Sequence, residues 1–163
     1  MTDRTNTPNP LDTPPIPVQA KLAAAWTSFM FLYLYVDYLH LYRPGTMDGI
    51  LAGVVFEFDV SPPLLTAFLA LVSIPALMVM LSMTLPARLN RATNLVVASL
   101  YIPVTAFNAV GETWDWAAFY GLSIGLELLL LAFILRSAWM WSRTTAAPGS
   151  RARRDVEAPR PTA

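Results

Sequence analysis

The segment Leu64–Leu85 reads LLTAFLALVSIPALMVMLSMTL and contains no charged side chain. A helix needs about 20 mostly apolar residues to cross the hydrocarbon core of a bilayer, which is about 30 Å thick. The segment is too long for a buried strand, and a helix satisfies its own backbone hydrogen bonds within lipid. We therefore predict a transmembrane helix over these residues.

Three further segments have the same character: residues 22–42, 92–110 and 116–135. The first carries Asp37 and His40, the second carries no charge, and the third carries only Glu127. Short links at 87–91 and 111–113 make consecutive spans antiparallel. The sequence thus predicts an all-α integral membrane protein, a four-helix bundle in up-down-up-down order.

Prolines mark both ends of the uncharged segment and two expected bends. Ser61-Pro62-Pro63 is typical of a helix N-cap followed by proline in the first turn, and Pro86 ends the helix. Pro75 and Pro103 lie inside spans, where proline removes one backbone hydrogen bond. We expect a kink at each of these two positions.

The overall composition agrees with a membrane protein. Hydrophobic residues make up 55% of the 163 residues and charged residues only 13%, against roughly 25% charged in soluble domains. All but one of the eleven basic residues are arginine, and the tails are rich in Ala, Pro and Thr. This bias is typical of a GC-rich bacterial genome.

The distribution of charge predicts the orientation in the membrane. With the amino terminus inside, Arg43 is the only basic residue in an outer loop, and the others are cytoplasmic. The outer loops are instead acidic, with Asp48, Glu57, Asp59, Glu112 and Asp115. Cytoplasmic loops carry the excess of Lys and Arg. We therefore expect both termini in the cytoplasm and the protein in the inner membrane of a bacterium.

The two ends of the chain differ from the transmembrane domain that we expect over residues 21–142. Residues 1–20 are rich in Pro and Thr, and residues 143–163 in Arg, Pro and Ala, so we expect both to be disordered. Residues 1–20 lack the features of a cleaved secretory signal, and the first span is interpreted as an uncleaved signal anchor.

The first outer loop, residues 43–63, is the longest connection between spans. Pro44-Gly45 predicts a turn, residues 46–53 favour a short interfacial helix, and residues 54–60 alternate apolar with acidic side chains. A re-entrant or interface-lying cap and a plain loop both remain open.

Polar side chains inside the spans indicate which faces point inward, because an acid that faces lipid costs about 2.5–3.5 kcal/mol or more. Offsets of three and four residues place them on helical stripes. We expect the polar groups of the first span to face the stripe of the third, with Glu127 in the interior. Whether these groups bind a ligand or only fix the packing stays open. The candidate ligand-binding residues are Tyr33, Asp37, His40, Asn94, Tyr101, Thr105, Asn108, Tyr120, Ser123 and Glu127.

Ala117, Gly121 and Gly125 form a ridge of small residues on the last span. Such ridges allow two helix backbones to approach closely. We predict that this ridge packs against another helix of the same chain, with a contact between two copies of the chain as the alternative.

Several functions and sites are excluded or not indicated by the sequence. The chain has no cysteine and one histidine, and no catalytic, metal-binding or phosphate-binding motif is present. The basic residues form no nucleic-acid-binding face. We therefore predict no metal, no cofactor and no nucleic-acid partner; the bilayer, a second copy or another membrane protein are the expected partners.

Short motifs along the chain resemble an uncharacterised family of small bacterial four-span membrane proteins, known only as a domain of unknown function. The motifs are YLYVD at 33–37, Leu81-Ser82, Leu85-Pro86, Asn90-Arg91, Asn94, Tyr120, Glu127 and Ala138-Trp139. The resemblance covers residues 20–142. It implies the four-helix layout and emphasises Asp37, Asn90, Arg91, Asn94 and Glu127, but it implies no reaction. The layout is also loosely similar to that of DoxX-like proteins, at the level of fold only.

Three classes of function follow, and the sequence does not decide between them. The first is an accessory or interaction protein whose bundle packs with itself or with a partner. The second is a module that binds or transports a proton, an ion or a small apolar molecule such as a lipid or quinone, using Asp37 and Glu127. The third is an integral membrane enzyme that acts on a lipid, against which the missing catalytic motifs argue.

Overall fold

The computed structural model describes residues 15–55, 58–108, 110 and 113–141. The structure is mostly helical, as predicted, with one small two-stranded hairpin. The elements in chain order are α1 (Val18–His40), α2 (Thr46–Leu51), β1 (Val54–Val55), β2 (Phe58–Asp59), α3 (Pro62–Thr84), α4 (Ala87–Phe107), the 3-10 helix η1 (Trp114–Trp116) and α5 (Ala117–Trp139). Residues 1–14 and 142–163 lie outside the described residues, and the prediction of disorder is wrong for residues 18–20, which belong to α1.

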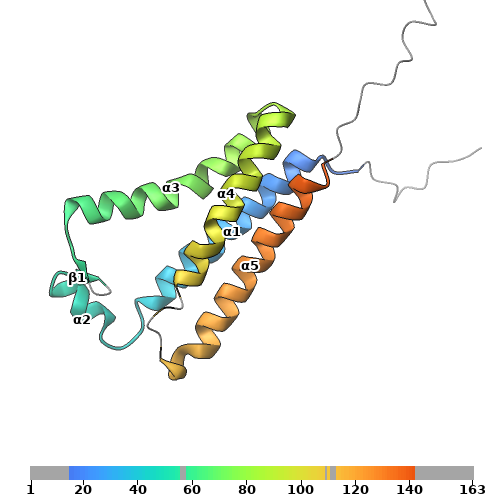
Figure 1. Cartoon of the computed structure of the whole chain (residues 1–163). Coiled ribbons are helices and arrows are strands. Elements are labelled where there is room, and N and C mark those ends of the chain that lie inside the picture. The colour runs from blue at the N-terminus through green and yellow to red at the C-terminus, as the bar shows by residue number, and fades with distance from the viewer. Residues whose placement is uncertain (1–14, 56–57, 109, 111–112, 142–163) are drawn as a thin grey trace, which may run out of the picture.

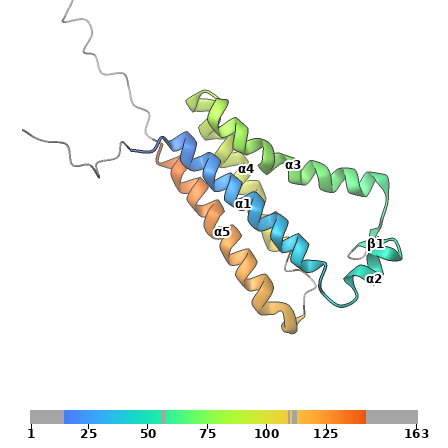
Figure 2. The same cartoon turned by 180° about the vertical axis from the view of Figure 1, so that it is seen from behind.

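The four long helices pack side by side, and α1 and α5 each pack against two of the other long helices. Helix α1 packs against α3 and α5, and α4 packs against α5. Helices α3 and α4 have fewer contacts with one another and are joined by a tight hairpin (Figures 1 and 2). The short helix α2 and the β-hairpin form a cap at the end of α3 that is remote from this turn (Figure 1).

The helix ends follow the predicted capping signals but not all of the predicted boundaries. The side chain of Ser61 caps α3 by accepting a hydrogen bond from the backbone N–H of Leu64, at 3.4 Å. Helix α4 begins at Ala87, so the link expected at 87–91 is helical instead. Proline at the N-terminus of a helix lacks an N–H that would have no partner there, and Pro86 therefore allows α4 to start at once.

Among the described residues, three helical segments are long and apolar enough to cross a membrane: Val18–His40, Pro62–Thr84 and Trp114–Trp139. The fourth expected span, residues 92–110, corresponds largely to α4, which is not among them. Two arginines and two asparagines in its first eight residues make α4 more polar than the others. Length and composition therefore indicate a membrane protein.

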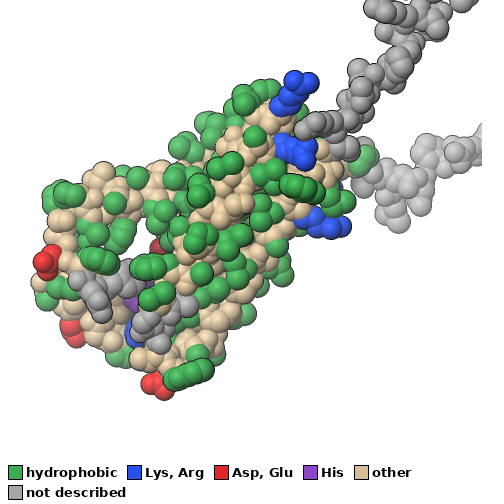
Figure 3. Space-filling view, viewed as in Figure 1, with side chains coloured by type: hydrophobic (Ala, Val, Ile, Leu, Met, Phe, Trp, Pro, Cys, Tyr) green, Lys and Arg blue, Asp and Glu red, His purple; other side chains and the backbone are tan. Residues whose placement is uncertain are grey.

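Helix α3 bends, and its first half leaves the other helices. Figure 1 shows this half running away from α4 toward the cap. Pro75 lies inside the helix and is buried, and proline removes the hydrogen bond to the carbonyl four residues earlier, here that of Leu71. The predicted kink in α3 is thus present, and in the space-filling view an opening separates the first half of α3 from the other helices (Figure 3).

The apolar core lies where all four long helices meet. It is built from Leu22, Ala25, Trp26, Phe29, Met78, Ala98, Tyr101, Leu131, Ile134 and Ala138. Trp26, Phe29 and Tyr101 make edge-to-face ring contacts at 5.7–6.3 Å within this core. Most of the visible Lys and Arg lie near the end where the termini leave the bundle, and most of the visible Asp and Glu lie at the opposite end (Figure 3).

Candidate functional site

Four fully buried polar side chains form one hydrogen-bonded network near the α3–α4 hairpin. Asn94 lies at its centre: its Oδ1 accepts from the Trp26 indole N–H at 2.7 Å, and its Nδ2 donates to Asn90 Oδ1 at 2.7 Å. Ser82 Oγ is 3.3–3.4 Å from both Asn94 side-chain atoms, and Asn90 Nδ2 donates to the Ser82 carbonyl at 2.6 Å. The network therefore links α1, α3 and α4.

The spacing of Asn90 and Asn94 explains how one helix supplies the centre of this network. Residues four apart lie on the same face of a helix, and both asparagines are 0% exposed. The side-chain oxygen and nitrogen of Asn94 both have protein partners, which favours a structural role. Whether Asn94 also binds a ligand stays a prediction.

Arg91 makes a related contact beside the network. Its guanidinium donates to the Trp139 carbonyl at 3.3 Å and lies 5.9 Å from the centre of the Trp139 ring. Cations interact favourably with the carbonyl groups at a helix C-terminus, and Trp139 is the last residue of α5. Arg91 therefore fixes the start of α4 to the end of α5.

Glu127 on α5 is completely buried, and its carboxyl group has no hydrogen-bond partner in the part of the chain that the structure describes. Its side chain is 0% exposed, and neither carboxyl oxygen bonds to any described residue. Thr105 of α4 interacts with it, but the Thr105 hydroxyl is also 0% exposed and lacks a partner of normal hydrogen-bond geometry. Buried polar groups are nearly always hydrogen-bonded, so this pair is unusual. The prediction that Glu127 points to the interior is confirmed.

Asp37, Tyr33 and Asn108 complete a group that we call the acidic cluster, defined as Tyr33, Asp37, Thr105, Asn108 and Glu127. The carboxyl groups of Asp37 and Glu127 interact electrostatically with one another and with Tyr33. Tyr33 also interacts with the side chain of Asn108. The cluster therefore joins α1, α4 and α5 within one neighbourhood.

We expected Asp37 to face the polar stripe of the third span, and its interaction with Glu127 and Tyr33 agrees with that orientation, but the residue lies at the surface of the cluster. Its side chain is exposed, whereas Tyr33 is half-buried. The buried residues of α1, which are Leu22, Ala25, Trp26 and Phe29, all lie in its first half. The departure of α3 removes one neighbour from the second half, so the predicted inward stripe of α1 ends before it reaches Asp37.

The polar stripe predicted on α4 does face inward. Asn94, Tyr101 and Thr105 are buried, and Asn108 is half-buried. The hydroxyl of Tyr101 donates to the Leu71 carbonyl. The Tyr101 side chain thus bonds to α3 at its kink and does not point into an open site.

His40 contacts α5, where we expected the stripe of α4. Its Nδ1 is hydrogen-bonded to the Tyr120 hydroxyl at 2.6 Å, and Arg43 donates to the same hydroxyl at 3.5 Å. Arg43 also lies 5.4 Å from the centre of the Trp116 ring. One turn along α5, the Ser123 hydroxyl donates to the Tyr120 carbonyl at 3.0 Å. The contacts of His40 and Arg43 thus join the end of α1 and the residues after it to the start of α5.

The predicted packing of the small-residue ridge within the chain is wrong. Ala117, Gly121 and Gly125 are all exposed, and a methyl group added at either glycine would meet nothing within 4 Å. The reason is that α5 turns Tyr120, Ser123 and Glu127 toward the other helices, which leaves the ridge outside. A contact between two copies of the chain stays a prediction.

Sequence reasoning left Trp26, Ser82 and Asn90 out of the candidate site residues. The signal for Asn90 was its spacing of four from Asn94, and the motif around it already carried weight in the family resemblance. Ser82 also belongs to a motif of that resemblance, and Trp26 lies on the same helical stripe as Tyr33 and Asp37, but the pairing of these residues with Asn94 is not encoded in the spacing along one helix. Among the described residues, no group of three His, Asp or Glu is arranged to hold a metal ion.

A family model confirms the resemblance seen in the sequence. A family of unknown function, DUF6326, matches residues 18–147, and the chain belongs to this family. No match was found among curated proteins or among solved structures.

Proposed function

We propose that this member of the DUF6326 family is a four-span protein of the bacterial inner membrane that binds and releases a proton at Glu127. The observation that carries the proposal is the buried carboxyl of Glu127, which has no hydrogen-bond partner among the described residues. A carboxylate without a partner in an apolar interior is costly. A bound proton removes that cost and gives the carboxyl a donor for the neighbouring Thr105 hydroxyl.

The polar content of α4 is compatible with a membrane span. Its 21 residues give a length of about 31 Å, close to the thickness of the hydrocarbon core. Its polar side chains Asn90, Asn94 and Thr105 are buried against other helices, whereas its exposed side chains include Leu89, Val96, Leu100, Ile102 and Phe107. The lipid-facing side of α4 is therefore apolar, although its overall composition is not.

Charge and aromatic side chains support an orientation with both termini in the cytoplasm. Lys and Arg gather near the termini, and acidic residues gather at the other end (Figure 3). This agrees with the excess of basic residues on the cytoplasmic side of membrane proteins. Tyr35, Tyr38 and Tyr42 are exposed near the acidic end, where aromatic residues favour the interface between lipid and water.

The positions of Asp37 and Glu127 support exchange of a proton with water more than permanent retention of a proton on Glu127. Asp37 is exposed and Glu127 is buried, yet their charges interact. An exposed acid beside a buried one provides an intermediate position for a proton that moves between water and the interior. A metal cation fits less well, because hard cations take six or more oxygen ligands and the described residues contain no group of three acids or histidines.

Infrared spectroscopy of the purified protein in vesicles tests this proposal. Spectra recorded while the pH is changed resolve the carboxyl groups that gain or lose a proton. We expect Glu127→Gln to remove one such band while circular dichroism shows the same helix content, and Asp48→Asn in the exposed cap to leave that band in place. The proposal is wrong if Glu127→Gln leaves every pH-dependent carboxyl band unchanged.

A second candidate function is that of an accessory protein that assembles through α5. The exposed ridge of Ala117, Gly121 and Gly125 favours it, because small residues on a lipid-facing helix allow close contact with another helix. Proton binding and assembly are compatible, since the ridge and Glu127 lie on different faces of α5.

A further inference from the structure

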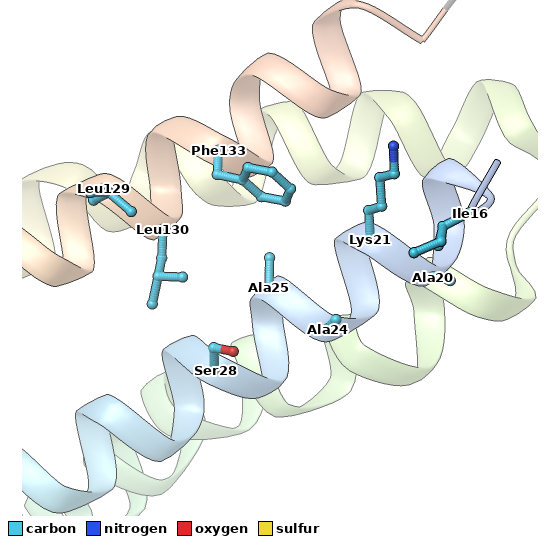
Figure 4. Close-up of a pocket in the computed structure, with 9 residues that line it drawn as sticks. All are labelled: Ile16, Ala20, Lys21, Ala24, Ala25, Ser28, Leu129, Leu130 and Phe133. Carbon is cyan, nitrogen blue, oxygen red and sulfur yellow. The ribbon is translucent and has the colours of Figure 1, made fainter. Parts of the chain in front are cut away.

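An apolar groove lies between α1 and α5, on the half of the molecule from which the termini leave (Figure 4). Its volume is about 400 Å³, and it is open to the surface. Helix α1 lines it with Ala20, Ala24, Ala25 and Ser28, and α5 lines it with Leu129 and Phe133. The groove belongs neither to the acidic cluster nor to the network around Asn94.

The groove exists because α1 is built from small side chains where it faces this part of α5. Three alanines and a serine leave the backbone of α1 nearly bare, and the larger side chains of α5 form the opposite wall. Figure 4 shows Leu130 and Phe133 projecting from α5 beside Ala25. A hollow with such walls suits a flexible hydrocarbon chain better than a side chain of fixed shape.

A single cation stands at the mouth of this apolar groove. Lys21 lines it and is exposed. Its side chain extends from α1 past the apolar residues (Figure 4). A positive charge therefore lies beside the groove at the end where we place the cytoplasmic lipid headgroups.

The length of the groove along α1 fits within one leaflet of the bilayer. Lys21 and Ser28 are seven residues apart, which corresponds to about 10 Å along the helix. One leaflet contributes about 15 Å of hydrocarbon. A phosphate beside Lys21 therefore places an acyl chain along the alanines of α1 and leaves the end of that chain near the middle of the bilayer.

We propose that this groove binds one anionic phospholipid of the surrounding cytoplasmic leaflet, with the headgroup on Lys21 and an acyl chain in the groove. The proposal rests on the membrane location and orientation given under the proposed function, and it is independent of proton binding at Glu127. Charge selects the headgroup, because each Lys or Arg near an anionic membrane surface contributes about 1 kcal/mol. Shape selects the chain.

Lipid retention measured by native mass spectrometry tests the proposal on the full chain. The protein is released from detergent micelles that contain equal amounts of phosphatidylglycerol and phosphatidylcholine, and the retained lipids are counted. We expect the parent protein to retain one phosphatidylglycerol in preference to phosphatidylcholine. Lys21→Gln should lower phosphatidylglycerol retention about fivefold, which corresponds to about 1 kcal/mol, with phosphatidylcholine retention unchanged.

Matched variants separate the groove from general attraction of lipid to charge. Ala24→Phe fills the groove at an exposed position and should lower retention of both lipids. Ala132→Phe is also exposed but does not line the groove, and Arg88→Gln removes a charge elsewhere; both should behave like the parent.

Three outcomes would overturn the proposal. The first is full lipid retention in both Lys21→Gln and Ala24→Phe, and the second is a loss of lipid retention only when residues 144–163 are removed. The third is a change in the oligomeric state of Ala24→Phe, which would assign the groove to a second copy of the chain. Because micelles have no inside or outside, the result does not depend on the orientation. Glu127→Gln should retain lipid normally, so a failure of the proton-binding proposal is seen separately.

Discussion

The hydroxyl of Tyr101 on α4 donates a hydrogen bond to the backbone carbonyl of Leu71 on α3. This carbonyl is the acceptor that Pro75 leaves without a partner inside α3. In an apolar environment a freed backbone group has to be satisfied by a neighbouring helix, a side chain or a water molecule. Tyr101 therefore makes the bend in α3 compatible with a membrane, and the bend separates the first half of α3 from α4.

Removing this hydroxyl tests the role of Tyr101. We expect Tyr101→Phe to lower the free energy of unfolding by about 1 kcal/mol, the range measured for hydrogen bonds between helices in membranes. The measurement is reversible unfolding in mixed micelles. Tyr35→Phe is the control, because Tyr35 is exposed, and its effect should be near zero.

Replacing the proline shows whether the two residues act on the same carbonyl. Pro75→Ala restores a backbone N–H that can bond to Leu71 within the helix. The loss caused by Tyr101→Phe should therefore be smaller in the Pro75→Ala background than in the parent. If both backgrounds lose the same free energy, the hydroxyl stabilises the protein in another way.

The network around Asn94 gives a second prediction about stability. Asn94→Ala removes the acceptor of the Trp26 N–H and the donor to Asn90. A buried polar group left without a partner costs about 1–3 kcal/mol. We expect a loss of about 2–3 kcal/mol in the free energy of unfolding in mixed micelles.

A control for Asn94 is Thr66→Ala, which removes an exposed local bond from Thr66 to the Pro62 carbonyl and should cost little. Trp26→Phe removes the same N–H from the other side. The double variant with Asn94→Ala should lose less than the sum of the two single variants. A fully additive result would contradict the shared hydrogen bond.

The sequence predicted most of the fold, because long apolar segments and prolines leave few alternatives. The uncharged segment Leu64–Leu85 became α3, shifted by two residues at its start, and Ser61 caps it as expected. The bend at Pro75 was predicted from the missing N–H alone. The start of α4 was placed five residues too late, because Arg88, Asn90 and Arg91 resemble a polar link in sequence, whereas all three are helical and Asn90 is buried.

The candidate site was harder to predict, because it depends on which helices are neighbours. The burial of Glu127 followed from its position in an apolar span, and this was correct. The exposure of Asp37 follows from the departure of α3, which one helical stripe cannot indicate. Equally, Gly121 and Gly125 form a ridge in any α-helix, but the rotation of α5 decides whether that ridge meets another helix.

Substitution of Gly125 separates the two possible uses of the ridge. Gly125 is exposed, and a β-carbon added there would meet nothing within 4 Å, so Gly125→Leu should not lower the stability of the monomer. If two copies associate through α5, the bulky side chain separates the backbones, and cross-linking between copies in vesicles should fall several-fold.

Leu126→Ala is the matched control for Gly125→Leu, because Leu126 is exposed on a different side of α5. It should leave cross-linking unchanged. Equal cross-linking in the parent and in Gly125→Leu would exclude the ridge as the contact between copies. A large loss of monomer stability would instead mean that the ridge packs within the chain after all.

The membrane topology can be tested at the two ends of α4, because α4 is the most polar of the four proposed spans. Fusion of a fluorescent protein that matures only in the cytoplasm, and of alkaline phosphatase that is active only outside, reports the side of each fusion point. We expect fusions at Pro86 and after Arg143 to be cytoplasmic, and fusions after Gly53 and after Thr113 to be external.

Opposite sides for the fusions at Pro86 and Thr113 mean that α4 crosses the membrane, as its buried polar face and apolar outer face favour. The same side for both would leave only three crossings, place the two termini on opposite sides, and invalidate the proposed orientation. A cytoplasmic signal after Gly53 together with an external signal at Pro86 would keep the four spans and reverse the protein, which would put Lys21 and its groove in the outer leaflet.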